Sequence, residues 1–166
     1  MAVLRIVHIL AGVFWVGSAI TIFLFLQPAA REVGPAAGPF MTHLAQKKRL
    51  PDITLGAAGL TILAGLLMYW RVSGGLDGDW ITSAYGLTIT IGALCAIAAV
   101  ILGAAVVRPS MLRAGAIAQE AAAAGGPTPE QGAEIQALQG KVRTAGAAII
   151  PLLIVAVAAM ASAQYL

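Results

Sequence analysis

The stretch VLRIVHILAGVFWVGSAITIFLFL, residues 3–26, is an apolar run with one arginine and one histidine near its beginning. A helix needs about 20 mostly apolar residues to cross the hydrocarbon core of a bilayer, so this run is long enough to span a membrane. It is also longer than the apolar region of a typical signal peptide. We therefore expect a membrane-spanning helix at residues 4–26 that remains in the mature protein.

Three further apolar runs, at residues 53–70, 84–107 and 145–165, have the same character. Apolar residues make up 60% of the 166 residues and charged residues only 10%, whereas about 25% is typical of a soluble domain. The four runs leave no room for a separate soluble domain. The sequence predicts an all-α fold, a single transmembrane domain over residues 1–166 that forms a four-helix bundle in contact with the lipid bilayer.

The segment 109–142, between the third and fourth runs, is the least apolar part of the chain. It contains the helix-forming sequence RPSMLRAGAIAQEAAAA, the turn sequence GGPTP and then TPEQ. Thr128, Pro129 and Gln131 fit the N-cap, first helical position and capping-box position of a new helix. We predict a helical hairpin that leaves the membrane and returns.

The segment between the first two runs has two parts. The first span is expected to end at Gln27–Pro28, and the Gly/Pro-rich sequence at 31–39 is predicted to form a loop. The sequence FMTHLAQKKRL at 40–50 predicts a short helix that either lies at the membrane interface or extends the second span. Pro51 would mark its junction with the bilayer.

The basic residues are distributed unevenly between the two predicted sides of the membrane. Eight of the ten lie in the loops between the first two spans and between the last two, and two lie on the other side: Arg31, Lys47, Lys48, Arg49, Arg108, Arg113, Lys141 and Arg143, against Arg5 and Arg71. The positive-inside rule then makes both basic loops cytoplasmic and both termini external, in the inner membrane of a bacterium. Topology and lipid headgroups explain these charges better than nucleic-acid binding does.

Small residues recur at helical spacing in three of the spans. Such stripes let helix backbones approach closely, within one chain, between copies or with other membrane subunits. The stripes consist of Thr54, Ala58, Thr61, Gly65 and Met68; of Thr88, Gly92, Ala96, Ala99 and Gly103; and of Ala156, Ala159 and Ala163.

His8 shares one helix face with Gly12 and Trp15, and an ionisable residue inside a span usually faces a helix neighbour or a cavity. One interpretation is an axial ligand of haem b or a metal ligand, with Gly12 leaving room for a flat group and Trp15 packed beside it. The other is a hydrogen bond from His8 to a neighbouring helix near the outer interface. His43 lies at the opposite membrane face and cannot share an iron with His8.

Two sequences carry a resemblance to a known family. HILAGVFWVG (residues 8–17) and KKRLPDITLGAAGLTILAGLLMYW (residues 47–70) resemble the first two helices of HemJ-type protoporphyrinogen oxidases and the related CopD-like copper-resistance membrane proteins. In HemJ-type proteins the first-helix histidine is implicated in haem binding, and His8 matches that position. Those enzymes also carry a lysine near the start of the third helix, which residues 80–100 lack.

The resemblance implies a member of the HemJ/CopD-like superfamily that either binds haem b at His8 or serves as an accessory subunit of a larger membrane assembly. The alternative is a haem-dependent protoporphyrinogen oxidase, which the missing lysine disfavours. A third possibility is copper handling. It is disfavoured because Cys95 and the methionines show no paired ligand spacing.

Overall fold

The computed structural model describes residues 1–166, except for the side chain of Pro35. The described chain is helical nearly throughout and contains no strand. Its elements are α1 (Ala2–Ile20), η1 (Thr21–Leu26, π-helical), α2 (Gln27–Val33), η2 (Gly34–Ala37, 3₁₀), α3 (Gly38–Thr42), η3 (His43–Lys47, π-helical), α4 (Leu50–Val72), α5 (Gly78–Thr82), α6 (Ala84–Leu102), η4 (Gly103–Val107, π-helical), α7 (Arg108–Ala123), α8 (Pro129–Ser162) and η5 (Ala163–Tyr165, 3₁₀).

Four continuous helical stretches are long and apolar enough to cross a membrane, and each contains one predicted span. They cover Ala2–Val33, Leu50–Val72, Ala84–Ala123 and Pro129–Tyr165. The large apolar side chains of these stretches point largely outward, as exposed fractions of 66% for Leu10, 63% for Leu63 and 61% for Leu94 show. Because a bilayer solvates such side chains, the prediction of an all-α membrane bundle is confirmed.

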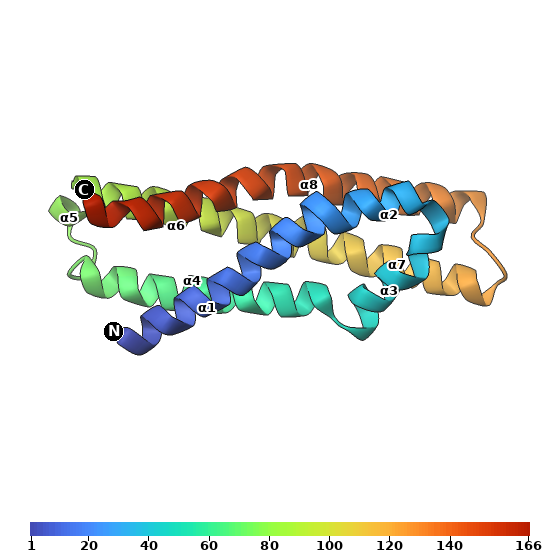
Figure 1. Cartoon of the computed structure of the whole chain (residues 1–166), viewed down its shortest axis with the longest axis horizontal. Coiled ribbons are helices and arrows are strands. Elements are labelled where there is room, and N and C mark those ends of the chain that lie inside the picture. Colours follow the sequence, from blue (N-terminus) through green and yellow to red (C-terminus); the bar gives the residue numbers. More distant parts are fainter.

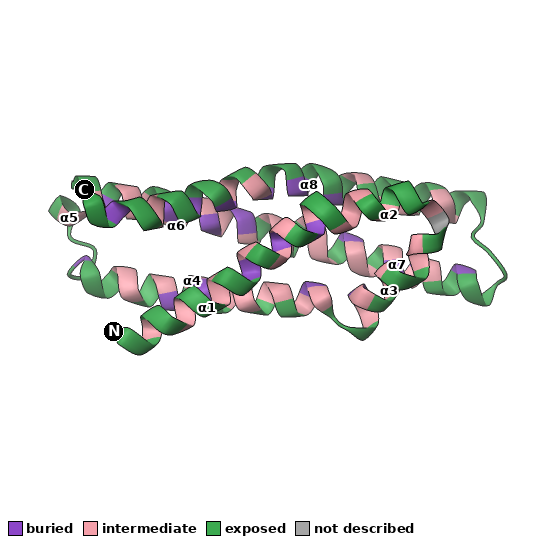
Figure 2. Cartoon of the chain, in the orientation of Figure 1, coloured by how far each residue is buried: buried purple, intermediate pink, exposed green. Residues whose placement is uncertain are grey.

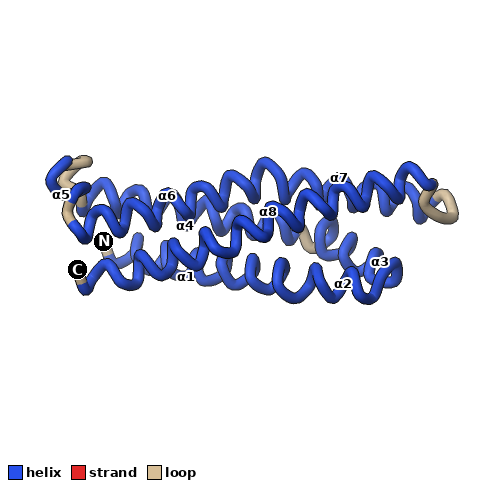
Figure 3. The backbone as a smooth tube through the Cα atoms, turned by 90° about the horizontal axis from the view of Figure 1, so that it is seen from above, coloured by secondary structure: helices blue, strands red, loops and turns tan.

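The four stretches form two closely packed pairs, α1 with α4 and α6 with α8. Both termini and α5 lie at one end of the bundle, here called the termini end (Figure 1). The segments α2, α3 and α7 lie at the other, here called the hairpin end, and the view from above shows the same arrangement (Figure 3).

The centre of the bundle is built mainly from alanine. Six of the nine residues in the core cluster are alanines, and buried positions follow the facing sides of the helices in Figure 2. Small side chains let the backbones come close, which compensates by van der Waals contact for the absence of a hydrophobic driving force between helices in lipid. The cluster consists of Trp15, Ala19, Ala58, Ala96, Ala99, Ala145, Ile149, Leu153 and Ala156.

The predicted small-residue stripe of the third span is confirmed over most of its length. A Cβ atom on Gly92 would lie 3.2 Å from the carbonyl oxygen of Ala156 and 3.2 Å from the Cβ of Ala159, so α6 and α8 are in close contact there. Gly103 is an exception, because a Cβ atom at that position would meet nothing within 4 Å. The stripe thus faces a helix of the same chain through Ala99 but not at Gly103.

The predicted hairpin is present as α7 and the first part of α8. The Thr128 hydroxyl accepts a hydrogen bond from the Gln131 backbone N–H, and the Gln131 side chain accepts one from the Thr128 N–H, which completes the capping box. Ile117 and Val142 are buried between the two arms. Arg113 and Glu134 connect the arms by an ion pair of 2.8 Å.

The prediction for residues 27–39 was wrong. The first helix does not end at Gln27–Pro28 but continues as α2 to Val33, and the predicted loop is a short 3₁₀ segment and the beginning of α3. The π-helical segment η1 ends at Leu26, two residues before this proline. Its wider turn is one way for a helix to accommodate a residue without an N–H group. The chain changes direction at Gly34, whose φ of +71° suits glycine.

The short helix predicted at residues 40–50 corresponds to α3 and η3. It is separate from α4, because Arg49 adopts a left-handed conformation with φ of +51° immediately before α4 begins. The segment packs on α7, where the Gln46 side chain lies against Gly115. Of the two alternatives from the sequence, an extension of the second span is therefore excluded.

Candidate functional site

His8 lies on α4. Its Nδ1 atom is 2.8 Å from the backbone carbonyl oxygen of Thr61. A Cβ atom on Gly65 would come within 2.9 Å of the His8 Cε1 atom, so the imidazole occupies the space that this glycine leaves open. Since a carbonyl oxygen only accepts, a neutral His8 donates from Nδ1 and keeps its lone pair on Nε2.

Gly12 and Trp15 are on the same side of α1 and also contact the rest of the bundle. A Cβ atom on Gly12 would lie 3.4 Å from the Thr61 Cγ2 atom, so the room beside this glycine is taken by α4. Trp15 is 6% exposed and belongs to the core cluster. The three predicted site residues thus lie along the contact between α1 and the other helices.

A haem held within this chain does not fit these residues. The Nδ1 bond of His8 is the kind of contact that orients a metal-binding histidine. The space that a porphyrin would need at Gly12, however, is occupied by the Thr61 methyl group. Neither the groove nor the cavity described below is lined by His8. A haem ligand at His8 remains a prediction that would need space outside this chain.

A small, partly open cavity of about 60 Å³ lies between the helices towards the hairpin end. Residues from all four long helices line it, and most of them are apolar. Among the described residues, Thr54 Oγ1 is the one buried side-chain oxygen or nitrogen without a hydrogen-bond partner. The lining consists of Trp15, Ala19, Ile22, Phe23, Pro51, Thr54, Leu55, Ala99, Val100, Gly103, Val107, Arg108, Met111 and Ile149.

A charged cluster lies beside this cavity. Asp52 accepts from Arg108 Nε at 2.7 Å through Oδ1 and from Arg49 Nε at 3.2 Å through Oδ2. The pair with Arg108 joins the start of α4 to the start of α7, two segments that are far apart in the sequence. The cluster carries one positive charge more than negative charge. The sequence did not predict it, because Asp52 and Arg108 are separated by 56 positions.

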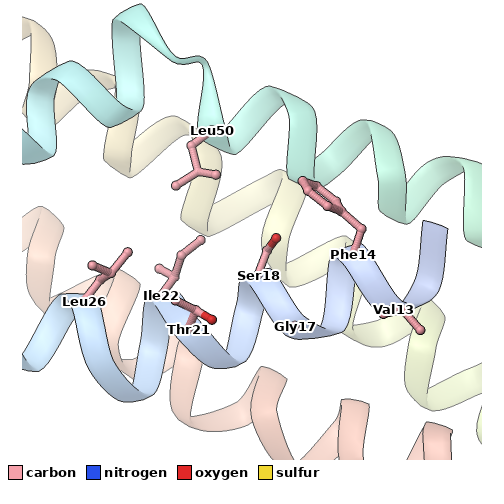
Figure 4. A pocket seen from close by; sticks show the side chains of 8 residues that line it. All are labelled: Val13, Phe14, Gly17, Ser18, Thr21, Ile22, Leu26 and Leu50. Carbon is pink, nitrogen blue, oxygen red and sulfur yellow. The ribbon is translucent and has the colours of Figure 1, made fainter. Parts of the chain in front are cut away.

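An open groove of about 370 Å³ separates the second half of the first helix from the start of α4. Phe14, Ser18 and Ile22 extend from the first helix towards α4, and Leu50 extends back towards them (Figure 4). The residues that line this α1–α4 groove are Val13, Phe14, Gly17, Ser18, Thr21, Ile22, Leu26 and Leu50.

The termini end holds an aromatic cluster that joins α4, α5 and α6. The rings of Tyr69 and Trp80 meet edge to face with centroids 5.2 Å apart, and Trp80 meets Tyr85 at 5.7 Å. The Tyr69 hydroxyl is 2.7 Å from Thr90 Oγ1. The contact between Tyr69 and Trp80 has no signal in the sequence.

The other potential metal ligands are dispersed. His43 is exposed in η3 at the hairpin end, whereas α1, which carries His8, begins at the termini end (Figure 1). Cys95 is half-buried in α6. In the part of the chain that the structure describes, no three His, Cys, Asp or Glu side chains come together in a way that could hold a metal ion.

The fold and these contacts define an integral membrane bundle of four helices. No protein-family model, curated protein or solved structure matches the chain.

Proposed function

We propose that this chain is an accessory subunit of a larger membrane assembly, in which a transmembrane helix of a partner subunit docks in the α1–α4 groove. The supporting observation is Gly17. It is exposed, it lines the groove, and a Cβ atom on it would meet nothing within 4 Å. The close approach that this glycine permits is therefore used by no helix of the described chain.

The neighbours of Gly17 also suit helix docking. Ser18 and Thr21 line the same groove, and neither side chain makes a hydrogen bond to another described residue, whereas Thr61, Thr88 and Thr90 each bond a carbonyl of their own helix. Small residues and hydroxyl groups are enriched where membrane helices associate, because backbones approach there and hydroxyls bond across the interface.

The test compares two glycine variants. Gly17→Leu fills the groove, whereas Gly56→Leu adds the same side chain to another exposed glycine with nothing within 4 Å, outside the groove lining. We expect native mass spectrometry in mild detergent to show a complex heavier than the 16.9 kDa chain for the wild type and for Gly56→Leu. Gly17→Leu should release the single chain.

A complex that survives Gly17→Leu would contradict the proposal, as would a wild type that is entirely a single chain in membranes solubilised gently. The mass of the complex also distinguishes partners. An integer multiple of the chain mass would identify the docked helix as that of a second copy, and any other mass would identify a different subunit.

We also propose that the hairpin end is cytoplasmic and both termini are external, in a bacterial inner membrane. The support is the basic residues: Lys47, Lys48, Arg49 and Arg113 lie in the segments at the hairpin end, together with Lys141 and Arg143 of the hairpin arm, whereas Asp77 and Asp79 lie at α5. Retention of basic segments on the cytoplasmic side orients short loops.

A second candidate function is haem b binding within the HemJ/CopD-like superfamily, with His8 as the ligand and the porphyrin outside the helices of this chain. One observation favours it, the Nδ1 contact of His8 with the Thr61 carbonyl, which leaves Nε2 free. The test is the absorption spectrum of protein purified from haem-replete cells. A Soret band that is lost in His8→Ala and kept in His43→Ala would support this candidate, and a colourless protein would count against it.

A further inference from the structure

The cavity is lined by polar groups whose hydrogen-bonding capacity is not satisfied by one another. Thr54 Oγ1 is buried, lines the cavity and has no partner. The threonines at 61, 88 and 90 bond the carbonyl four residues earlier at 2.7–2.8 Å, whereas the Thr54 hydroxyl is buried without such a bond. Buried polar groups in proteins are nearly always hydrogen-bonded, which indicates that something occupies the cavity.

Arg108 supplies further donors to the same cavity. A guanidinium group has five N–H donors, and the hydrogen bond from Arg108 to a described residue uses Nε alone. Its acceptor, Asp52, already has one oxygen on Arg108 and the other on Arg49. The cluster of Arg49, Asp52 and Arg108 therefore has donors to spare and a net positive charge.

The remaining lining residues supply no side-chain acceptor that could match these donors. Apart from Thr54 and Arg108 they are apolar, and Trp15 has a ring nitrogen that can only donate. An occupant that accepts hydrogen bonds and carries negative charge would complement this site.

The volume limits the size of the occupant. A cavity of about 60 Å³ exceeds the roughly 10–15 Å³ that one water molecule needs but falls far below the roughly 300 Å³ at which pockets for organic ligands begin. We propose that the cavity binds a small monovalent anion of halide size, held by Arg108 and the Thr54 hydroxyl.

Trp15 lines the cavity and can report on it. The chain has three tryptophans, so the double variant Trp70→Phe, Trp80→Phe leaves Trp15 as the single one. Iodide is both a small monovalent anion and a quencher of tryptophan fluorescence. We expect iodide to quench Trp15 in the purified protein with saturation, caesium ions at equal ionic strength to leave it nearly unaffected, and chloride to compete with iodide.

Two variants of Thr54 distinguish iodide binding at this site from unspecific collisions of iodide with Trp15. Thr54→Val keeps the shape and removes the hydroxyl, so the apparent iodide affinity should fall about tenfold, as expected for one hydrogen bond to a charged group. Thr54→Ser should retain the affinity. Arg108→Lys keeps the charge and should bind more weakly, whereas Arg113→Gln, which removes a charge paired with Glu134 away from the cavity, should bind normally.

Three results would overturn the proposal. The first is quenching by iodide that is no stronger than quenching by caesium, and the second is iodide quenching that does not saturate. The third is equal iodide affinity in Thr54→Val and the wild type, which would mean that the cavity holds water only. Because Thr54→Val is nearly isosteric, this comparison remains decisive even where an Arg108 variant does not fold.

Discussion

The Nδ1 atom of His8 lies 2.8 Å from the carbonyl oxygen of Thr61, and its imidazole fills the space above Gly65 on α4. The aromatic, ionisable side chain of His8 on α1 therefore packs against Gly65, one of the glycines of α4. This pair fixes the position of α1 along α4 near the termini end, independently of any cofactor.

A methyl group at Gly65 should disturb this contact. Gly65→Ala would place Cβ 2.9 Å from His8 Cε1, so the ring or a helix must move. Overpacking of this kind typically costs about 1–3 kcal/mol. Gly59→Ala, whose Cβ would meet nothing within 4 Å, is the matched control and should be neutral or slightly stabilising through helix propensity.

A double variant tests whether the clash with His8 causes the destabilisation expected for Gly65→Ala. In a His8→Ala background, Gly65→Ala should lose most of its effect on thermal stability in detergent, because the clashing ring is gone. The hydrogen bond itself should contribute little, about 0.6 kcal/mol on average for such contacts in a membrane, so His8→Asn alone should be mild. Equal effects of Gly65→Ala in both backgrounds would exclude the proposed packing.

The third span should show the same contrast between a packed and an open glycine. Gly92→Leu would force α6 away from the Ala156 carbonyl and Ala159 and should lower the melting temperature strongly. Gly103→Ala adds a methyl group that borders the cavity and meets nothing within 4 Å, so it should be tolerated. If both variants melt at the wild-type temperature, α6 and α8 do not approach as closely as described.

The capping box at the hairpin turn gives a separate prediction. Thr128→Ala should destabilise the hairpin by about 1 kcal/mol. Bonds from its own backbone N–H and from the Thr128 hydroxyl lower the pKa of Glu130 below its usual 4.5. The ionised Glu130 side chain therefore stabilises the hairpin fully at pH values above its pKa in the unfolded chain. This stabilisation is lost as the pH falls through the lower pKa that Glu130 has in the folded chain. Amide hydrogen exchange over residues 130–135 should show both effects, and unchanged exchange in Thr128→Ala would contradict them.

The parts of the fold that could be predicted depend on local chemistry. Apolar runs determine the spans, and Thr128 with Gln131 determines a helix start, because the relevant groups are close in sequence. The helix end expected at Pro28 was wrong because η1 widens the helix just before the proline, and η4 precedes Pro109 in the same way. Propensity rules treat a proline as a stop and do not include this adjustment.

The parts of the site that could not be predicted depend on contacts between distant residues. The sequence alone shows that His8 is an unusual residue for an apolar span. It does not show that His8 contacts Thr61, because a sequence does not indicate which turn of another helix a side chain contacts. The pair of Asp52 with Arg108 and the free Thr54 hydroxyl have the same origin. Ser73 directly follows α4 and is only 1% exposed, and its hydroxyl accepts a hydrogen bond from the Leu76 N–H, a local turn that no helix or span signal indicates.

Membrane orientation can be tested with two engineered cysteines, each in a Cys95→Ser background. Ser73 is unsuitable for this purpose because it is buried. Thr82 at α5 and Ala122 at the end of α7 are both exposed and lie at opposite ends of the bundle.

An impermeant thiol reagent added to intact cells with a permeabilised outer layer should label Thr82→Cys and leave Ala122→Cys unmodified. After lysis both should react, which controls for accessibility. This outcome follows from the eight-to-two division of basic residues between the two sides. Labelling of Ala122→Cys alone in intact cells would reverse the orientation and place the basic hairpin outside.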